Sequence, residues 1–243
     1  MAKPVKRLYF GFIQRIKRIF YSFRKNDIYV LMFHDVYDGE NNNPAINVNK
    51  NNFIDFINAL RRRNVKFIGI DDIFLNSEEE KVIITFDDVY EGVVLNAIPL
   101  LNELHIPFTL FIAPCFIDKE GYIKSSQIKE LKNNPLCTIG FHTNNHKLMR
   151  NLSKTEANNE IDCNEFERKY GVHCEYFAYP YGSVYACAKR NIDLLAKSNY
   201  KMAFSTINSA VSENFIKRNR VYIPRINVCD NTWESILNKK IKR

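Results

Sequence analysis

The chain has 243 residues, of which 46% are hydrophobic and 26% are charged. These fractions are ordinary for a globular protein, and the mean hydropathy of −0.31 excludes a chain that lies mostly inside a membrane. A chain of this length buries a sizeable core, and barrels of this size commonly form one domain. We therefore expect one domain with an appendage.

The net charge of +8 is concentrated at the N-terminus. Residues 1–25 contain eight Lys or Arg and no acid, and the rest of the chain holds 27 basic and 27 acidic residues. The folded body is thus neutral, which argues against a nucleic-acid partner. On a helical wheel the apolar residues of 5–23 share one side and the cations take the other. This pattern predicts a basic amphipathic helix at 1–26, which either contacts an anionic membrane through residues 3–25 or packs on the body.

The N-terminal segment lacks the features of a secretory signal, because cations interrupt it and no small-residue cleavage site follows. No segment approaches the roughly 20 apolar residues needed to span a bilayer. The six cysteines have no C-x-x-C spacing, so we expect reduced thiols rather than disulfides or zinc ligands. These features favour a cytoplasmic protein, peripheral at the inner membrane face if the basic helix binds lipid.

Strand-like and helix-like segments alternate along the chain. Apolar runs predict strands at 28–34, 66–70, 82–86, 107–113, 137–141, 175–179, 201–205 and 221–228. Helical spacing and capping signals predict helices at 53–63, 93–104, 153–170, 184–198 and 232–242. Such alternation implies parallel strands with right-handed crossovers, in a closed barrel or an open sheet.

In the stretch KVIITFDDVY, residues 81–90, a predicted buried strand ends in two adjacent carboxylates, Asp87 and Asp88. Reacting groups commonly lie at the C-terminal ends of parallel strands. Neighbouring carboxylates repel each other, so a fold that keeps them together usually supplies a cation or a shared proton. The alternative is a helix N-cap followed by an acid in the first turn, and the dipeptide alone favours it.

His142 and His146, in GFHTNNH, follow the predicted strand at 137–141 with i, i+4 spacing. This spacing brings both imidazoles to one side of a helix or tight turn. Two imidazoles and one carboxylate, with a fourth position left for water, are typical of a catalytic zinc site. A histidine pair alone is more often a surface or capping feature, but together with the Asp-Asp strand end it favours a metal site.

A third motif, FAYPYG at residues 177–182, also ends a predicted strand. Pro180 stops the strand and Gly182 permits a tight turn, so the backbone N–H of Tyr181 could face a cavity. An ordinary aromatic-rich turn is the alternative, and the motif alone favours it.

TFDD, H-T-x-x-H and FAYPYG, in this order, resemble the motifs of NodB-type polysaccharide deacetylases, carbohydrate esterase family four. The most similar branch acts on poly-N-acetylglucosamine. The likeness includes IPFTLFIAP, CTIGFHTNNHKL, NYKMAFST and YIPRINV, and it extends from about residue 28 to residue 228. It implies an α/β fold in which residues 27–243 form a distorted barrel of about seven βα units, with the helix at 1–26 appended.

The resemblance also implies which residues act. Asp88, His142 and His146 would hold a divalent metal, with Zn²⁺ as the first candidate. Asp87 would be the general base, and the N–H of Tyr181 would help to stabilise the tetrahedral oxyanion. Substrate contacts would come from the turn formed by Tyr179, Pro180, Tyr181 and Gly182.

Two positions depart from the family pattern. Family members commonly have an Arg in the third motif that orients the base, and this chain has Ala178 there. Arg225, in YIPRINV, is our candidate for that role. The usual C-terminal histidine that acts as general acid is also missing, and His34, at the end of the first predicted strand, is our candidate because a near-neutral pKa suits protonation of an amine. The alternative for His34 is a buried histidine that hydrogen-bonds to Asp35 or to backbone.

The resemblance implies a metal-dependent de-N-acetylase that acts on an N-acetylhexosamine in a glycan or in its lipid-linked precursor. Two other functions stay open. The chain could be a glycan-binding protein that kept the fold with weakened catalysis, or an amidase of a small amide that is not a sugar.

Overall fold

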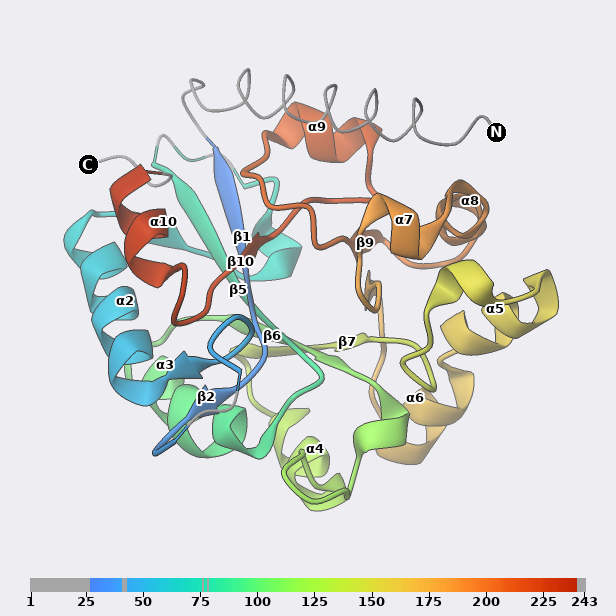
Figure 1. Ribbon diagram of the computed structural model, residues 1–243, viewed down its shortest axis with the longest axis horizontal. Helices are drawn as coiled ribbons and strands as arrows, with labels where there is room; N and C mark the ends of the chain where they lie inside the picture. Colours follow the sequence, from blue (N-terminus) through green and yellow to red (C-terminus); the bar gives the residue numbers. More distant parts are fainter. Residues whose placement is uncertain (1–26, 41–42, 76, 78, 240–243) are drawn as a thin grey trace.

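The computed structural model describes residues 27–40, 43–75, 77 and 79–239. The basic helix expected at 1–26 lies outside the described residues. The main sheet is parallel and curved, and helices surround it (Figure 1). Its strands are β1 (Ile28–Phe33), β4 (Lys66–Phe67), β5 (Lys81–Asp87), β6 (Phe108–Ile112), β7 (Cys137–Phe141), β8 (Tyr176–Ala178), β9 (Met202–Phe204) and β10 (Ile226–Asn227), and a second sheet pairs β2 (Val36–Tyr37) with β3 (Val48–Asn49).

The order of strands in the main sheet is β10-β1-β5-β6-β7-β8-β9, and β4 pairs with the first residues of β5. The two outer strands of this path approach each other. Phe204 in β9 forms a parallel bridge with Ile223, and three residues later Ile226 in β10 pairs with Leu31 in β1. The segment from Ile223 into β10 therefore contacts both edges and completes a distorted barrel. The predicted α/β barrel is confirmed.

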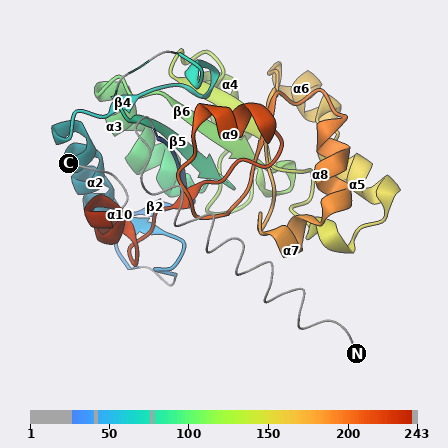
Figure 2. The same cartoon turned by 90° about the horizontal axis from the view of Figure 1, so that it is seen from above.

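Helices follow most strands and cover the outside of the sheet. Figure 2 shows α5 to α8 grouped at one end of the molecule and α2 and α10 at the other. None of the described helices is both long and apolar enough to cross a membrane. The helices are α2 (Lys50–Arg62), α3 (Ile98–Glu103), α4 (Ser125–Leu131), α5 (Lys154–Ile161), α6 (Asn164–Tyr170), α7 (Val184–Cys187), α8 (Lys189–Ala196), α9 (Glu213–Arg218) and α10 (Trp233–Lys239), with a π-helix η2 (Val93–Ala97) and 3-10 turns η1 (Ile70–Asp72), η3 (Pro114–Phe116) and η4 (Met149–Asn151).

Every residue of β5 is buried, as expected for a strand covered on both faces. Val82, Ile84 and Phe86 belong to an apolar layer between the sheet and the helices, and Ile83 belongs to a second layer inside the barrel. Because side chains alternate along a strand, Asp87 continues the inner row. The strand therefore carries its last carboxylate into the barrel interior.

Several predicted boundaries were wrong. The helix predicted at 153–170 is two helices, α5 and α6, and the helix predicted at 184–198 breaks at Ala188, where φ is 57°. The strands predicted at 66–70 and 221–228 shorten to two residues each. Helices α4 and α9 were not predicted, because each has only six or seven residues and little periodic signal.

The inner layer packs too closely for a side chain at Gly140 in β7. A Cβ there would lie 2.7 Å from the ring of Phe111, its partner in β6. We expect Gly140→Ala to lower the free energy of unfolding by about 1–3 kcal/mol, as overpacking does. Gly69→Ala is the matched control, because its nearest neighbours would be at 3.5 Å and 3.8 Å. Denaturant unfolding measures both, and equal stability of the two variants would contradict this packing.

Candidate metal centre and reaction site

The residues singled out in the sequence come together where the parallel strands end. Asp87 is the last residue of β5 and Asp88 follows it, with φ of 62°. His142 follows β7, and His34 follows β1. Arg225 immediately precedes β10. The structure therefore brings residues from three separate strand ends, and from the approach to a fourth strand, into one region at the rim of the barrel.

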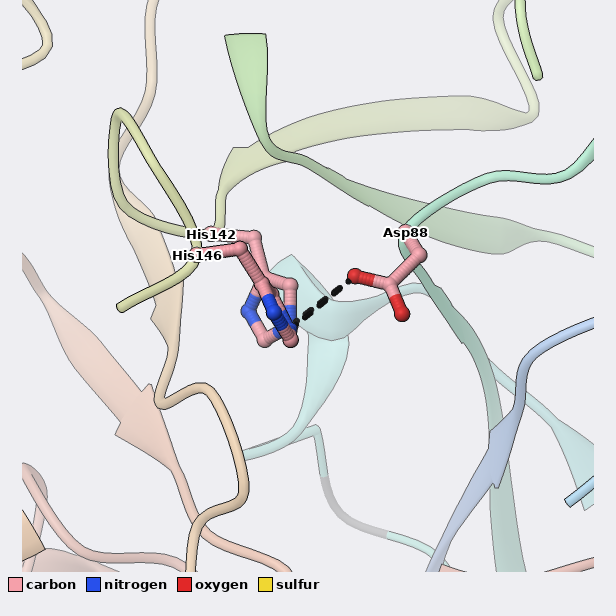
Figure 3. Close-up of side chains that lie close together, drawn as sticks. All are labelled: Asp88, His142 and His146. Carbon is pink, nitrogen blue, oxygen red and sulfur yellow. Dashed lines mark ion pairs between the residues drawn. The ribbon is translucent and has the colours of Figure 1, made fainter. Parts of the chain in front are cut away.

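Asp88, His142 and His146 form a compact cluster. Their ligand atoms all lie within 4.8 Å of one another. The Nε2 atoms of His142 and His146 lie 3.5 Å and 3.2 Å from Oδ1 of Asp88, and both rings point toward the carboxylate (Figure 3). Within the described part of the chain, this is the one group of at least three His, Cys, Asp or Glu side chains with such geometry.

The chemistry of these three side chains fits a divalent cation. Burial lowers the pKa of His142 to about 3, so its ring is neutral and can offer a lone pair. Its Nδ1 donates a hydrogen bond to the Ala178 carbonyl at 2.7 Å, which leaves Nε2 as the atom facing Asp88. Oδ1 of Asp88 is buried and accepts no hydrogen bond from the described residues. Burial and the charge of Asp87 raise the pKa of Asp88 to about 7, because both destabilise its ionised form. A bound cation would stabilise the ionised carboxylate.

His146 reaches the cluster through a tight loop rather than a helix. Thr143 and His146 have φ of 65° and 50°, in the left-handed region. The His146 N–H donates to Oγ1 of Thr143 at 3.0 Å, which closes the loop. The imidazole of His146 packs against the rings of Phe116 and Tyr181, with centroids 5.3 Å and 5.1 Å away. These two ring contacts restrain the orientation of the His146 imidazole.

Asp87 and Arg225 form a buried bidentate ion pair. Each Nη atom of Arg225 lies 2.6 Å from a different oxygen of Asp87. Arg225 has no exposed surface, and it also donates to the Ser205 carbonyl and to Oγ1 of Thr85, at 3.0 Å and 3.2 Å. Burial raises the pKa of Asp87, but the charge and hydrogen bonds of Arg225 outweigh it and lower that pKa to about 2. Asp87 is therefore ionised at neutral pH.

His34 lies within electrostatic reach of Asp87, Arg225 and His146. Burial lowers the pKa of His34 to about 4, against the opposing effect of the Asp87 charge. This differs from the near-neutral pKa expected from the sequence, because the end of β1 is more enclosed than an exposed loop. Nδ1 of His34 is buried without a hydrogen-bond partner in the described chain, so neither Asp35 nor backbone satisfies that atom.

The FAYPYG turn presents one exposed aromatic ring. Tyr181 is 57% exposed and has φ of 58°, whereas Tyr179 is fully buried and donates from its hydroxyl to the Val221 carbonyl at 2.9 Å. Pro180 and Gly182 are buried, and a Cβ on Gly182 would lie 2.4 Å from the backbone nitrogen of Thr206. Of the four substrate-contact candidates, only Tyr181 has an exposed side chain, and burial of Tyr179 argues against direct contact by its ring.

Two groups that support the cluster were not predicted from the sequence. One is the Ala178 carbonyl, which fixes the tautomer of His142 and carries no signal in the sequence because any residue has a carbonyl. The other is Glu160, which is buried and accepts hydrogen bonds from Asn145. In the sequence, Glu160 stands out only as an acidic residue close to the apolar positions of the helix predicted at 153–170.

Residues 75–203, more than half of the chain, match the family model described as polysaccharide deacetylase. The chain belongs to the polysaccharide deacetylase family, which confirms the resemblance seen in its motifs. It is accordingly a deacetylase, a hydrolase that acts on amide bonds.

The relatives agree with this assignment. The chain is 27% identical over 212 residues to the poly-beta-1,6-N-acetyl-D-glucosamine N-deacetylase of Staphylococcus aureus, and the alignment covers 79% of this chain and 71% of the relative. The enzyme of the same name from Staphylococcus epidermidis is 23% identical over 270 residues, with 98% and 91% covered.

Two solved structures share the fold. IcaB from Ammonifex degensii has a TM-score of 0.70 at 20% identity, covering 89% of this chain and 98% of that one. Streptococcus pyogenes deacetylase PplD, solved in complex with acetate, has a TM-score of 0.77 at 18% identity, covering 90% and 100%. At these identities the likeness establishes the architecture.

The cluster predicts metal-dependent stability. At a Zn²⁺ concentration of 100 times Kd, bound metal should add about 2.7 kcal/mol to the free energy of unfolding. We expect His142→Ala to abolish this gain, because it removes one of the three candidate ligands. His173→Ala is the matched control, because that side chain is 77% exposed and lies outside the cluster. Thermal unfolding with and without Zn²⁺ measures the gain, and a gain retained by His142→Ala would contradict the assignment.

The buried ion pair predicts a large stability effect. Arg225→Met leaves the Asp87 charge buried without a partner, which should cost about 3–5 kcal/mol. Adding Asp87→Asn should recover part of this loss, because the unpaired charge is then gone. Lys189→Met is the control, since it removes an exposed pair with Asp193 that should contribute about 0–1 kcal/mol. Denaturant unfolding compares the variants, and similar losses of stability for Arg225→Met and Lys189→Met would contradict a stabilising role of the buried pair.

Proposed function

We propose that this deacetylase hydrolyses the acetamide of an N-acetylhexosamine, in a glycan or in its lipid-linked precursor, with the help of a bound divalent metal, and releases acetate. The observation that carries the proposal is the position of an ionised Asp87 beside the Asp88, His142 and His146 cluster. Two imidazoles and two carboxylates with different surroundings provide a metal site and a separate base in one place.

Asp88, His142 and His146 would hold the metal, and we propose Zn²⁺ because this N/O donor set suits it. When bound, such an ion lowers the pKa of a water molecule and polarises the acetamide carbonyl. The buried position of Asp88 and the neutral state of His142 support this assignment.

Asp87 is the proposed general base. Its carboxylate is ionised and held in one orientation by Arg225, so it can accept a proton from the attacking water. In this proposal Arg225 takes the positioning role of the Arg that other family members have at the place of Ala178. Arg225 comes from a different part of the chain, but its bidentate contact orients the Asp87 carboxylate.

The N–H of Tyr181 is the proposed donor to the oxyanion. It donates to no acceptor in the described part of the chain, whereas the Tyr181 carbonyl accepts from Oγ1 of Thr206 at 2.9 Å.

His34 is the proposed donor of the proton to the leaving amine. Its ring rests uncharged at neutral pH, so the proton must reach it during the reaction, and Asp87 is the neighbouring group that would carry one.

The substrate proposal rests on the relatives, which are named as deacetylases of poly-beta-1,6-N-acetyl-D-glucosamine. We propose a polymer or precursor that contains N-acetylglucosamine. We further propose that residues 27–243 form the catalytic barrel and that residues 3–25 contact anionic lipid at the cytoplasmic face, where such precursors are made. The absence of the motif Arg and that of the C-terminal His are the two features that favour a glycan-binding protein with weakened catalysis, and the Arg225 contact with Asp87 counters the first of them.

The chemistry is tested by acetate release from Zn²⁺-loaded protein with N-acetylglucosamine oligomers. Loss of a general base typically costs about 10²–10⁴ in rate, so we expect Asp87→Asn to lower kcat by that factor with little change in KM. Asp193→Asn, at an exposed carboxylate, should keep full activity. Full activity of Asp87→Asn would exclude it as the base, and turnover of small amides but not sugars would point to the amidase.

The membrane proposal has a separate test. Deleting residues 1–24 should release the protein from vesicles that contain anionic lipid, because the deletion removes seven of the eight N-terminal cations. Co-sedimentation with anionic and neutral vesicles measures this. Equal binding of the full and shortened chains to anionic vesicles would contradict the proposal.

A further inference from the structure

The loop that carries His146 is joined to the C-terminal end of α5 by hydrogen bonds in both directions. In one direction, N–H groups of the loop donate to carbonyls at the end of α5. The backbone N–H of Asn144 donates to the Glu160 carbonyl at 3.0 Å, and its side-chain amide donates to the carbonyls of Asn159 and Asp162 at 2.7 Å and 2.8 Å. The last carbonyls of a helix have no partner within the helix, so the loop supplies a cap from outside.

In the other direction, a side chain of α5 accepts hydrogen bonds from the loop. The Glu160 side chain is 3% exposed, and its two oxygens accept from the backbone N–H and the side-chain amide of Asn145, both at 2.8 Å. Lys147 is the nearest cation, with Nζ 3.7 Å away and a side chain that is 54% exposed. A buried carboxylate without donors is costly, so these two bonds are what makes the position of Glu160 tolerable.

The loop needs support because its backbone is unfavourable. Thr143 and His146 are not glycines, yet both have positive φ. Such conformations persist where the surrounding structure over-determines them. Asn145 lies between these two residues and directly precedes His146, so a bond to its N–H restrains the Asn144–Asn145 peptide unit in the middle of the loop.

From this reciprocal arrangement we infer that Glu160 is a positioning residue of the metal centre. By holding Asn145, it keeps the His142–His146 loop in the conformation that brings the His146 imidazole to Asp88. Glu160 does not touch the cluster itself and has no part in the proton transfers. The inference rests on the proposed function only in taking Asp88, His142 and His146 as metal ligands.

The test is the affinity of the purified apoprotein for Zn²⁺ and Co²⁺ alone, together with the visible absorption of the Co²⁺ form, which reports coordination geometry. Changes to residues that orient metal ligands typically cost 10–100-fold in metal affinity. We expect Glu160→Ala to lose affinity in this range and to alter the Co²⁺ spectrum. Glu160→Gln should recover most of the affinity, because a glutamine can accept from the Asn145 N–H and pair with its amide.

Glu156→Ala is the matched control. Glu156 lies one turn earlier on α5 and caps that helix by accepting from the Ser153 N–H at 2.7 Å, but it does not contact the loop. It should lower Tm and leave metal affinity and the Co²⁺ spectrum unchanged. Equal losses of affinity in Glu156→Ala and Glu160→Ala would overturn the inference, because helix stability rather than loop position would then be responsible.

A second variant covers the case in which Glu160→Ala does not fold. Asn145→Ala keeps the backbone bond to Glu160 and removes the side-chain bond, so its affinity should fall between those of wild type and Glu160→Ala. Wild-type affinity in Asn145→Ala or in folded Glu160→Ala would overturn the inference.

Metal affinity also separates this inference from the proposed function. Metal binding that depends on Glu160, without acetate release, would refute the deacetylation proposal and support the positioning role. A wild-type chain that binds neither ion would overturn both.

Discussion

The ion pair between Asp87 and Arg225 is the interaction on which the site depends. It lies inside the barrel, where an unpaired charge is costly, and it ties the end of β5 to the segment that leads into β10. Because Arg225 keeps Asp87 ionised, a negative charge stays at the strand end, where it raises the pKa of Asp88 and opposes the effect of burial at His142. Burial of Asp88 and His142, together with this pair, sets the electrostatic character of the cluster.

The three candidate metal ligands are oriented by groups outside the cluster. The Ala178 carbonyl fixes one imidazole, and Thr143 closes the loop that carries the other. Phe116 and Tyr181 both pack against the His146 ring. Such support sets the positions of the donor atoms before any ion arrives, which lowers the conformational entropy lost on binding. In this protein the support comes from β8, the η3 turn and the end of α5, so the site draws on much of one side of the barrel.

The strands could be predicted well because buried parallel strands are uninterrupted apolar runs, as in β1, β5 and β6. Helix ends were predicted less well. The helix predicted at 153–170 breaks after α5, where the side-chain amide of Asn144 donates to the carbonyls of Asn159 and Asp162. Asn144 lies 15 and 18 residues from these acceptors, so the local sequence does not reveal this cap. The strand predicted at 221–228 shortens because the chain leaves β9 after one bridge and moves to β1 to close the barrel. Both errors arise where a long-range contact overrides local preference.

The sequence by itself determined the family and the donor types, because TFDD, H-T-x-x-H and FAYPYG keep their spacing and order whatever the rest of the chain does. It could only nominate Arg225 and His34, and it gave no indication of Glu160 as part of the site. Arg225 is 138 residues from Asp87, and only closure of the barrel brings its guanidinium to that carboxylate. The tertiary structure also decided the protonation state of His34, since burial at the end of β1 lowers the pKa of its imidazole to about 4. Motif chemistry is local, whereas the orientation and charge of these groups depend on contacts between strand ends that lie far apart in the chain.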